Sequence, residues 1–219
     1  MTFLFAVAAT AMLPVQKWEI KAPFTEGFTQ KLAVQAEITT QGTMALDFMA
    51  VLTIKKKDDK GFQAELAWKD LQLDGQPIGE DLTAPAQLGT RGELVRAEDE
   101  ELGETLTRMA NPFFILYPPN GVQAGDKWSH SQELKTTDGN FKVTYDYEVK
   151  GVEKIGETEV LKIAVKAAES GLTPPMKYDG FYWIAKDGTI ERLELNITDW
   201  PVPPMGGSFP LKLKATKSK

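Results

Sequence analysis

Residues 141–150 read FKVTYDYEVK, and apolar and polar side chains alternate along them without a break. Successive side chains of a β-strand point to opposite faces of a sheet, so this stretch places an apolar row on one face and a polar row on the other. The same alternation recurs on both sides of it, in residues 31–39, 44–54, 62–68, 161–167, 176–184, 193–197 and 209–215. The sequence therefore predicts a mainly β protein.

Short glycine-containing turns separate these stretches, as at Gln41-Gly42 and at residues 57–61. Further turn signals are the Asp-Gly pairs that begin at Asp74, Asp138, Asp179 and Asp187. Strands joined by tight turns form an antiparallel meander. The pair at Asp179 falls inside an apolar stretch, so a β-bulge is the alternative there.

Residues 98–111 follow a different period. Leu102, Leu106, Met109 and Phe113 recur at spacings of four, three and four, which places them on one face of a helix. The sequence thus predicts antiparallel meander sheets, as a curved sheet, a half-barrel or a two-lobed barrel-like unit, with one helical insert near residues 99–116.

Glu98 or Asp99 is expected to cap the start of this helix, and Pro112 either ends it or begins a second turn. The insert divides the chain into a first β half (residues 12–97), the helical insert with a Pro-rich loop (98–121) and a second β half (122–219). The last strand, near residues 209–215, is expected to close against the sheet, because its apolar row needs burial.

The amino-terminal stretch Thr2–Leu13 is uncharged and almost wholly apolar, and it includes the A-x-A pattern Ala9-Thr10-Ala11. About twelve apolar residues are too few to span a bilayer, which needs about 20. The pattern favours a signal peptide over residues 1–11 and a protein exported to the periplasm or the cell exterior. A buried first strand is the alternative.

The composition excludes several kinds of chemistry. The chain of 219 residues has no cysteine and one histidine, so disulfides, thiolate nucleophiles, Cys-ligated metals and paired-histidine metal sites are ruled out. Its 25 Lys and Arg residues against 31 Asp and Glu residues give a net charge of −6, which argues against nucleic-acid binding. The sequence indicates no cofactor, no metal and no transmembrane segment.

One motif carries a resemblance. Residues 117–128, YPPNGVQAGDKW, combine a Pro-containing loop, a Val and Gly-Asp-x-Trp after a short helix. This pattern resembles an uncharacterised family of exported, β-rich bacterial proteins, and the likeness extends over about residues 99–200. Such proteins are similar in architecture to periplasmic lipoprotein carriers, in which a curved sheet holds an acyl chain under helices. Fold likeness alone does not carry function.

Asp126 of this motif is interpreted as a turn residue whose carboxylate accepts backbone N–H groups, with Trp128 filling the core. Asp126 and His130 would share a strand face, but about 13 Å would separate them, beyond hydrogen-bonding reach. The adjacent Ser129 and Ser131 would face the opposite side, so the sequence offers no nucleophilic triad.

The apolar side chains near the helix exceed what one helix face requires. A packed core accounts for them, since sheet faces are covered by helices or by other strands. The alternative is a cavity that takes an apolar ligand. The candidate lining residues are Leu102, Leu106, Met109, Phe113 and Phe114.

The preferred function is a non-catalytic cell-envelope or secreted binding or structural protein, which could hold an apolar or lipid-like ligand between sheet and helix. Its partners would be a hydrophobic small molecule or an envelope component, and the oligomeric state is left open. One alternative is a carboxylate-dependent hydrolase of unknown substrate, because acidic residues are plentiful. Another is an assembly or adhesion module that pairs through its edge strands.

Overall fold

The computed structural model describes residues 17–97, 102–136 and 139–219. The predicted signal peptide of residues 1–11 lies outside them. The strands are β1 (Thr29–Thr39), β2 (Thr43–Asp58), β3 (Gly61–Leu73), β4 (Gln76–Pro77), β5 (Leu82–Leu88), β6 (Leu94–Ala97), β7 (Lys127–Thr136), β8 (Gly139–Ile155), β9 (Thr158–Ser170), β10 (Lys177–Ala185), β11 (Ile190–Val202) and β12 (Gly207–Lys217). The helices are α1 (Gly103–Ala110) and the short 3₁₀ helices η1 (Asn111–Phe113) and η2 (Pro203–Met205).

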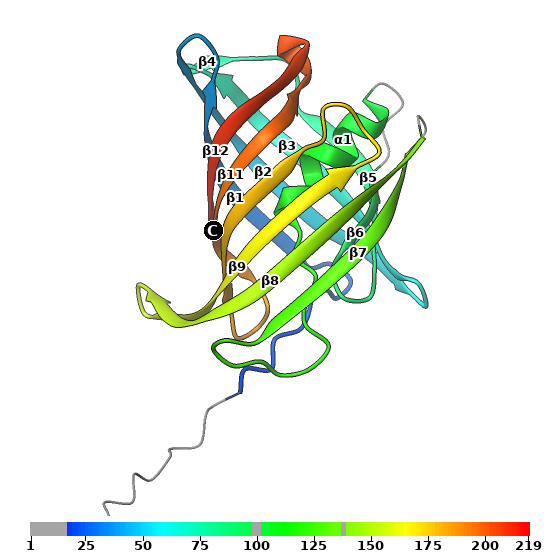
Figure 1. Cartoon of the computed structure of the whole chain (residues 1–219), viewed down its shortest axis with the longest axis vertical. Coiled ribbons are helices and arrows are strands. Elements are labelled where there is room, and N and C mark those ends of the chain that lie inside the picture. The colour runs from blue at the N-terminus through cyan, green and yellow to red at the C-terminus, as the bar shows by residue number, and fades with distance from the viewer. Residues whose placement is uncertain (1–16, 98–101, 137–138) are drawn as a thin grey trace, which may run out of the picture.

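The strands form one antiparallel sheet in the order β6-β5-β3-β2-β1-β12-β11-β10-β9-β8-β7, and β4 pairs with β3. Each half of the chain is a meander, and the two meanders join where β1 pairs with β12, from Leu32 opposite Lys217 to Ile38 opposite Leu211. The sheet curls until its edge strands β6 and β7 lie next to each other (Figure 1). The predicted mainly β, antiparallel class is confirmed, and so is the docking of the last strand. The division of the chain into two β halves as domains stays a prediction.

The alternation in residues 141–150 corresponds to the two faces of the curved sheet. Phe141, Val143, Tyr145, Tyr147 and Val149 are buried inside it. The polar residues between them are exposed or half-buried on the outside. The inward apolar rows of both meanders meet in one continuous core.

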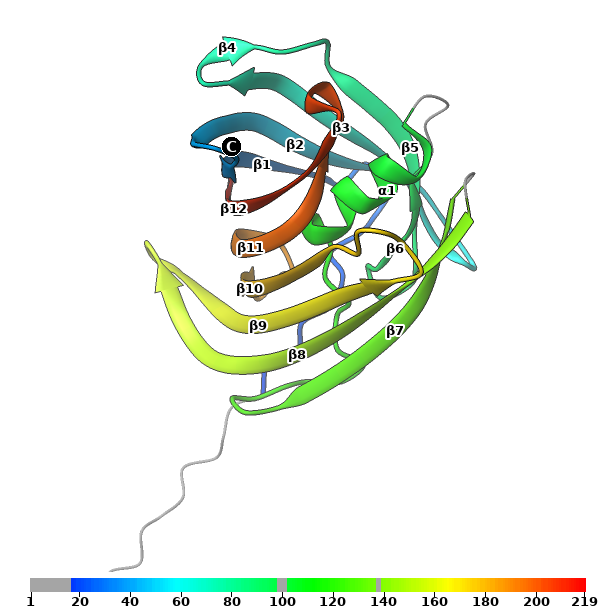
Figure 2. The same cartoon turned by 45° about the horizontal axis from the view of Figure 1, so that its top comes forward.

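Residues 102–117, here called the inner segment, lie inside the curve of the sheet, and α1 is enclosed by strands in Figure 2. This position explains why residues 112–117, PFFILY, are apolar or aromatic throughout, because none of them faces water. Residues 106–117 are all buried. The segment therefore fills the space that the sheet encloses.

The helix is shorter than predicted. It begins at Gly103, with Leu102 as a cap that makes no side-chain capping hydrogen bond. The predicted caps Glu98 and Asp99 lie outside the described residues. One 3₁₀ turn over Asn111–Phe113 follows α1, and Phe114 is already extended. Pro112 causes this change, because proline cannot supply the N–H that would continue the α-helix.

Residues 17–28, here called the strap, cross the end of the barrel-like sheet that is lowest in Figure 1. The strap is joined to the loop before β7 by a two-way backbone pairing of Trp18 with Val122, at 2.7 and 2.9 Å. Ile20 and Phe24 point into the core and are buried. The strap therefore covers one opening of the curved sheet with apolar side chains.

The Asp-Gly pair at Asp179 forms neither a turn nor a bulge. It lies within β10, and the register of β10 with β9 and β11 continues through it. Gly180 has φ +154°, and a Cβ there would lie 2.0 Å from the carbonyl oxygen of Glu194. Glycine is needed at this position for the close approach of two strands rather than for a change of direction.

Candidate functional site

Tyrosine hydroxyls from the second meander hold the inner segment. The Tyr145 hydroxyl donates to Asn111 Oδ1 over 2.7 Å. The Tyr182 hydroxyl donates to the carbonyl oxygen of Pro112 over 2.9 Å. These bonds pair the polar groups of the segment at the point where α1 ends and its carbonyls lack helical partners. The segment is thus fixed to β8 and β10 at its turn.

A second attachment lies nearer the end of the segment. The indole Nε1 of Trp128 donates to the carbonyl oxygen of Leu116 over 3.1 Å. The N–H of Leu116 donates to the Tyr147 hydroxyl over 3.4 Å, and the rings of Trp128 and Tyr147 stack with centroids 4.9 Å apart. Both backbone groups of one extended residue are therefore paired by side chains of β7 and β8.

All five tyrosines of the chain are buried inside the curved sheet: Tyr117, Tyr145, Tyr147, Tyr178 and Tyr182. Burial raises the pKa of each of these phenols above its ordinary value of 10. The hydroxyls therefore remain protonated at physiological pH and remain able to donate hydrogen bonds. Such groups suit attachment of the inner segment better than proton transfer, which requires a pKa near the working pH.

A buried ion pair connects α1 to β9. Arg108 Nη2 lies 2.9 Å from Glu169 Oε2, and both side chains are almost fully buried. Glu169 Oε2 also accepts the N–H of Met176 over 2.8 Å, and Arg108 Nη2 donates to the carbonyl oxygen of Pro174 over 3.0 Å. Buried charges persist in proteins when they are paired and hydrogen-bonded in this way. The pair fixes the helix against β9 and the loop that follows it.

Side chains also close the seam between the edge strands. The Thr107 hydroxyl donates to the carbonyl oxygen of Ala97 over 2.9 Å and accepts the Ala97 N–H over 3.3 Å. Gln132 Nε2 of β7 donates to the carbonyl oxygen of Leu94 over 2.7 Å. An unpaired strand edge invites association with other strands. Here the edge of β6 is covered by α1 and β7.

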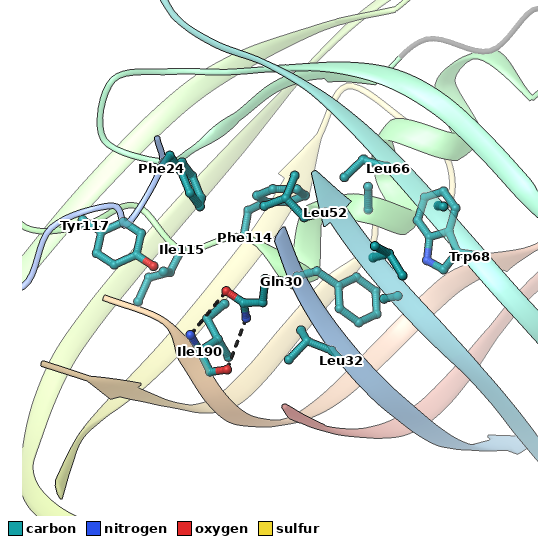
Figure 3. Close-up of a pocket in the computed structure, with 16 residues that line it drawn as sticks. Phe24, Gln30, Leu32, Leu52, Leu66, Trp68, Phe114, Ile115, Tyr117 and Ile190 are labelled. Atoms are coloured by element: carbon teal, nitrogen blue, oxygen red, sulfur yellow. Dashed lines mark hydrogen bonds between the residues drawn. The ribbon is translucent and has the colours of Figure 1, made fainter. Parts of the chain in front are cut away.

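The first meander meets the inner segment differently. A cavity of about 40 Å³ lies between β1, β2 and β3 on one side and residues 110–117 on the other, with Phe24 of the strap at its margin (Figure 3). Ala50 and Leu52 point inward, opposite the buried Leu32 and Leu66, yet both are only half-buried. Inward apolar surface thus remains uncovered at this cavity.

The polar groups of the lining are few. Gln30 pairs with the backbone of Ile190, donating to its carbonyl oxygen over 3.2 Å and accepting its N–H over 3.5 Å. Trp68 also lines the cavity, and its buried indole Nε1 has no hydrogen-bond partner among the described residues. Figure 3 shows this nitrogen on the edge of the ring that faces the other lining side chains. No residue of the lining carries a charge.

Only two of the five predicted lining residues border the cavity. Phe113 and Phe114 line the cavity. Leu106 and Met109 are buried in the core and do not belong to the lining, and Leu102 is half-buried at the start of α1. Their role in ligand binding stays a prediction.

Sequence reasoning missed the sheet side of the cavity. Leu52, Leu66 and Trp68 stand on the predicted apolar rows, so their inward direction was available from the alternation. No pattern indicated which inward residues would remain uncovered. Phe24 belongs to no periodic stretch and gave no signal.

The Gly-Asp-x-Trp motif forms the predicted turn, whereas Trp128 is half-buried and packs against the core rather than filling it. Gly125 has φ +88°, and Asp126 Oδ2 accepts the N–H of Gln123 over 3.0 Å. His130 stacks on Tyr145 with ring centroids 6.5 Å apart. No hydrogen bond joins Asp126 to His130 in the described part of the chain. The pair therefore offers no acid–base dyad.

The described residues provide little for metal or carboxylate chemistry. They contain no group of three or more His, Asp or Glu side chains placed to hold a metal ion. The acids Asp47, Asp179 and Glu194 line a groove of about 590 Å³ on the outer face of the sheet, where Lys212 and Lys214 stand beside them. This open face does not exclude water, unlike an enclosed reaction site. Among the same described residues, the helices are too short or too polar to cross a membrane.

Comparison with known proteins finds solved structures of similar fold but no matching family. No family model and no curated protein matches the chain. A protein of Bacteroides fragilis inferred to be exported, with a YmcC-like fold, is 12% identical over 93% of this chain and 100% of its own, with a TM-score of 0.43. The hypothetical lipoprotein YmcC of Escherichia coli K12 is 8% identical over 92% of this chain and 91% of its own, with a TM-score of 0.38.

A protein of Parabacteroides distasonis inferred to be a lipoprotein is 11% identical over 90% of this chain and 98% of its own, with a TM-score of 0.39. Scores this low support no conclusion about what the present chain binds or does. The function has to be argued from its own residues.

Proposed function

We propose that this protein is a non-catalytic, exported binding protein that holds a small apolar ligand between β1–β3 and the inner segment. One observation carries the proposal, namely the uncharged cavity beside the half-buried Ala50 and Leu52. Leaving apolar surface uncovered costs free energy in proportion to its area, about 25 cal/mol per Å². A ligand that covers this surface recovers that free energy.

The size of the cavity limits what it accepts without rearrangement. About 40 Å³ is little more than the share of liquid volume that one water occupies, whereas sites for drug-sized ligands measure about 300–1,000 Å³. A larger ligand therefore requires a lining side chain to move. The inner segment is held by the tyrosines and by the ion pair of Arg108 with Glu169, which disfavours its displacement.

Phe24 is the best candidate for such a movement. Its strap is attached by backbone hydrogen bonds from Trp18 to Val122 and from Gly27 and Phe28 to Ile54 of β2. Residues 19–24 between these points make no backbone hydrogen bond within the described part of the chain. Withdrawal of Phe24 would break its contacts with Phe28 and Phe62, whose rings lie 5.6 and 5.4 Å away. We therefore place the ligand entrance at the strap.

The exported location is proposed from the apolar stretch Thr2–Leu13 and its A-x-A pattern. The descriptions of the three similar folds as exported proteins or lipoproteins agree with it. Amino-terminal sequencing of the protein from its own host tests this proposal. A mature chain that begins after Ala11 would support it, and an intact Met1 in the functional protein would contradict it.

Xenon provides a test matched to the cavity, because it enters dry apolar cavities of proteins. Under xenon pressure, the methyl resonances of Ala50 and Leu52 should shift in a saturable way. Ala50→Leu fills the cavity and should abolish the shift at Leu52. Ala33→Leu adds the same side chain on the outer face of β1 and should leave the shift unchanged.

The ligand itself is tested by native mass spectrometry of the protein after incubation with lipid and metabolite extracts. The wild type and Ala33→Leu should retain an apolar molecule that Ala50→Leu does not. Equal retention by all three proteins, or no retention together with no xenon shift, would refute the proposed site.

A further inference from the structure

The chemical class of the ligand can be argued from Trp68, on the premise that the proposed function is correct. Trp68 is 3% exposed, and its ring forms part of the cavity wall. An indole N–H can only donate a hydrogen bond. Buried donors in proteins almost always have an acceptor, so an unpaired one requires an explanation. Here no described residue supplies that acceptor.

The other polar groups of the lining are bonded elsewhere and are not within hydrogen-bond distance of this N–H. Both ends of the Gln30 amide are engaged by the backbone of Ile190. The Tyr117 hydroxyl donates to the carbonyl oxygen of Gly188 over 2.5 Å. Trp68 of the cavity wall therefore carries a donor without an acceptor, while Gln30 and Tyr117 are hydrogen-bonded within the protein.

We infer that the ligand carries a hydrogen-bond acceptor oxygen attached to an apolar body, and that the indole N–H of Trp68 donates to this oxygen. The half-buried Ala50 and Leu52 cover the apolar part of the molecule. Ala50 is the direct cross-strand partner of Trp68, so the donor and the uncovered apolar surface are adjacent.

The cavity wall also disfavours a charged ligand. Its residues include no Lys, Arg, Asp or Glu, so an ionised carboxylate or phosphate would lose its hydration without gaining a counter-charge. A carbonyl group suits the site better than a hydroxyl, because it brings an acceptor without a donor that needs its own partner. The inferred class is a neutral carbonyl compound, such as a ketone or an acyl ester.

Three small molecules of the same branched shape test this class by NMR titration of the full-length protein. Acetone has the acceptor, isobutene replaces the oxygen by an apolar group, and acetate adds a charge. Acetone should move the indole N–H proton of Trp68 downfield, as a new hydrogen bond does. Isobutene should shift the methyls of Ala50 and Leu52 without that downfield movement, and acetate should produce neither change.

Trp68→Phe removes the N–H and keeps an aromatic ring. It should weaken acetone binding about fivefold to tenfold, as expected for one hydrogen bond, and change isobutene binding less than twofold. Trp200→Phe is the matched control, because the Trp200 indole N–H is also buried and unpaired but lies outside the lining. It should change neither affinity.

The outcomes separate this inference from the proposed function. If isobutene and acetone both bind and Trp68→Phe weakens neither selectively, the site stands and the inferred ligand class is wrong. The ligand class is equally wrong if acetone moves the indole N–H of another tryptophan instead. If neither acetone, isobutene nor xenon perturbs a lining methyl, the proposed function itself fails. The indole shift in the wild type remains a test of the ligand class even if Trp68→Phe does not fold.

Discussion

Strands β7–β10 and strands β1–β3 hold the inner segment by different means. Strands β7–β10 reach it with tyrosine, tryptophan and glutamate side chains, and the contact surface there is closed and hydrogen-bonded. Strands β1–β3 meet it only with side-chain packing, and no hydrogen bond joins residues 105–117 to them in the described part of the chain. The polar wall fixes the segment and the apolar wall leaves the cavity. Function in this protein is therefore expected on the side that lacks hydrogen bonds.

Alkaline pH should have the largest effect, through the buried tyrosines of the polar wall and of the inner segment. The five buried tyrosines have raised pKa values, so each binds its proton more tightly in the native chain than in the unfolded chain. Their contribution to stability is complete below pH about 10, the pKa of an unfolded tyrosine, and is lost as the pH rises towards the native-state values. Complete unfolding is expected at strongly alkaline pH.

Far-ultraviolet circular dichroism and phenolate absorbance measured together test this prediction. Ionisation of the tyrosines should coincide with loss of the sheet signal. Tyr182→Phe removes one of the protons involved and should make the fall of stability with pH less steep. Phenolate formation in a chain that keeps its sheet signal would show that the hydroxyls do not hold the inner segment.

Arg108→Met should give the next largest effect, because it leaves the buried Glu169 carboxylate without its guanidinium. The expected loss of unfolding free energy is about 3–5 kcal/mol, measured by urea denaturation. The double variant with Glu169→Met should recover most of this loss, since an apolar pair replaces the buried charges.

Lys186→Met is the control on the outer face, where Lys186 pairs with the exposed Glu159 at 2.7 Å. An exposed pair contributes about 0–1 kcal/mol, so this variant should be nearly neutral. Equal effects of Arg108→Met and Lys186→Met would contradict the role given to the buried pair.

Two leucine truncations compare the walls directly. Their losses of unfolding free energy should differ by less than those of Arg108→Met and Lys186→Met. Leu134→Ala on β7 removes a fully buried side chain and should cost about 2–5 kcal/mol. Leu52→Ala removes a half-buried side chain beside the existing cavity, so the expected cost is about 1 kcal/mol. Urea denaturation of both variants measures the difference. A larger loss for Leu52→Ala would mean that the cavity wall is packed as tightly as the rest of the core.

The sequence predicted which face of the sheet each side chain points to, but not how deeply each element is buried. Alternation fixed the inward rows, such as Phe141 to Val149, because the period of a strand is two whatever lies opposite it. It did not reveal that α1 lies inside the sheet, since the curvature of the sheet depends on contacts between distant strands. Glu169 stood on the inward row that ends at Ala167, and its parity was a readable sign of a buried carboxylate. Arg108 gave no such sign.

The position and size of the cavity could not be predicted, for a related reason. Its volume is the difference between the space that the curved sheet encloses and the side chains that occupy it, and small side chains such as Ala50 leave that space unfilled. Periodicity identifies Ala50 as inward, but it contains no information about the distance to the inner segment. Two of the predicted residues, Phe113 and Phe114, do line the cavity.

The pairing of β1 with β12 also has a consequence for how the molecule forms. Leu32 and Lys217, direct neighbours in the sheet, are almost as far apart along the chain as two strand residues can be. Contacts of such long sequence separation slow folding, because the loop between them must close before they form. The edge strand β1 of the first meander therefore remains unpaired until β12 has been synthesised. A chain that completes its sheet only when its last strand is added keeps the edge of β1 unpaired until then.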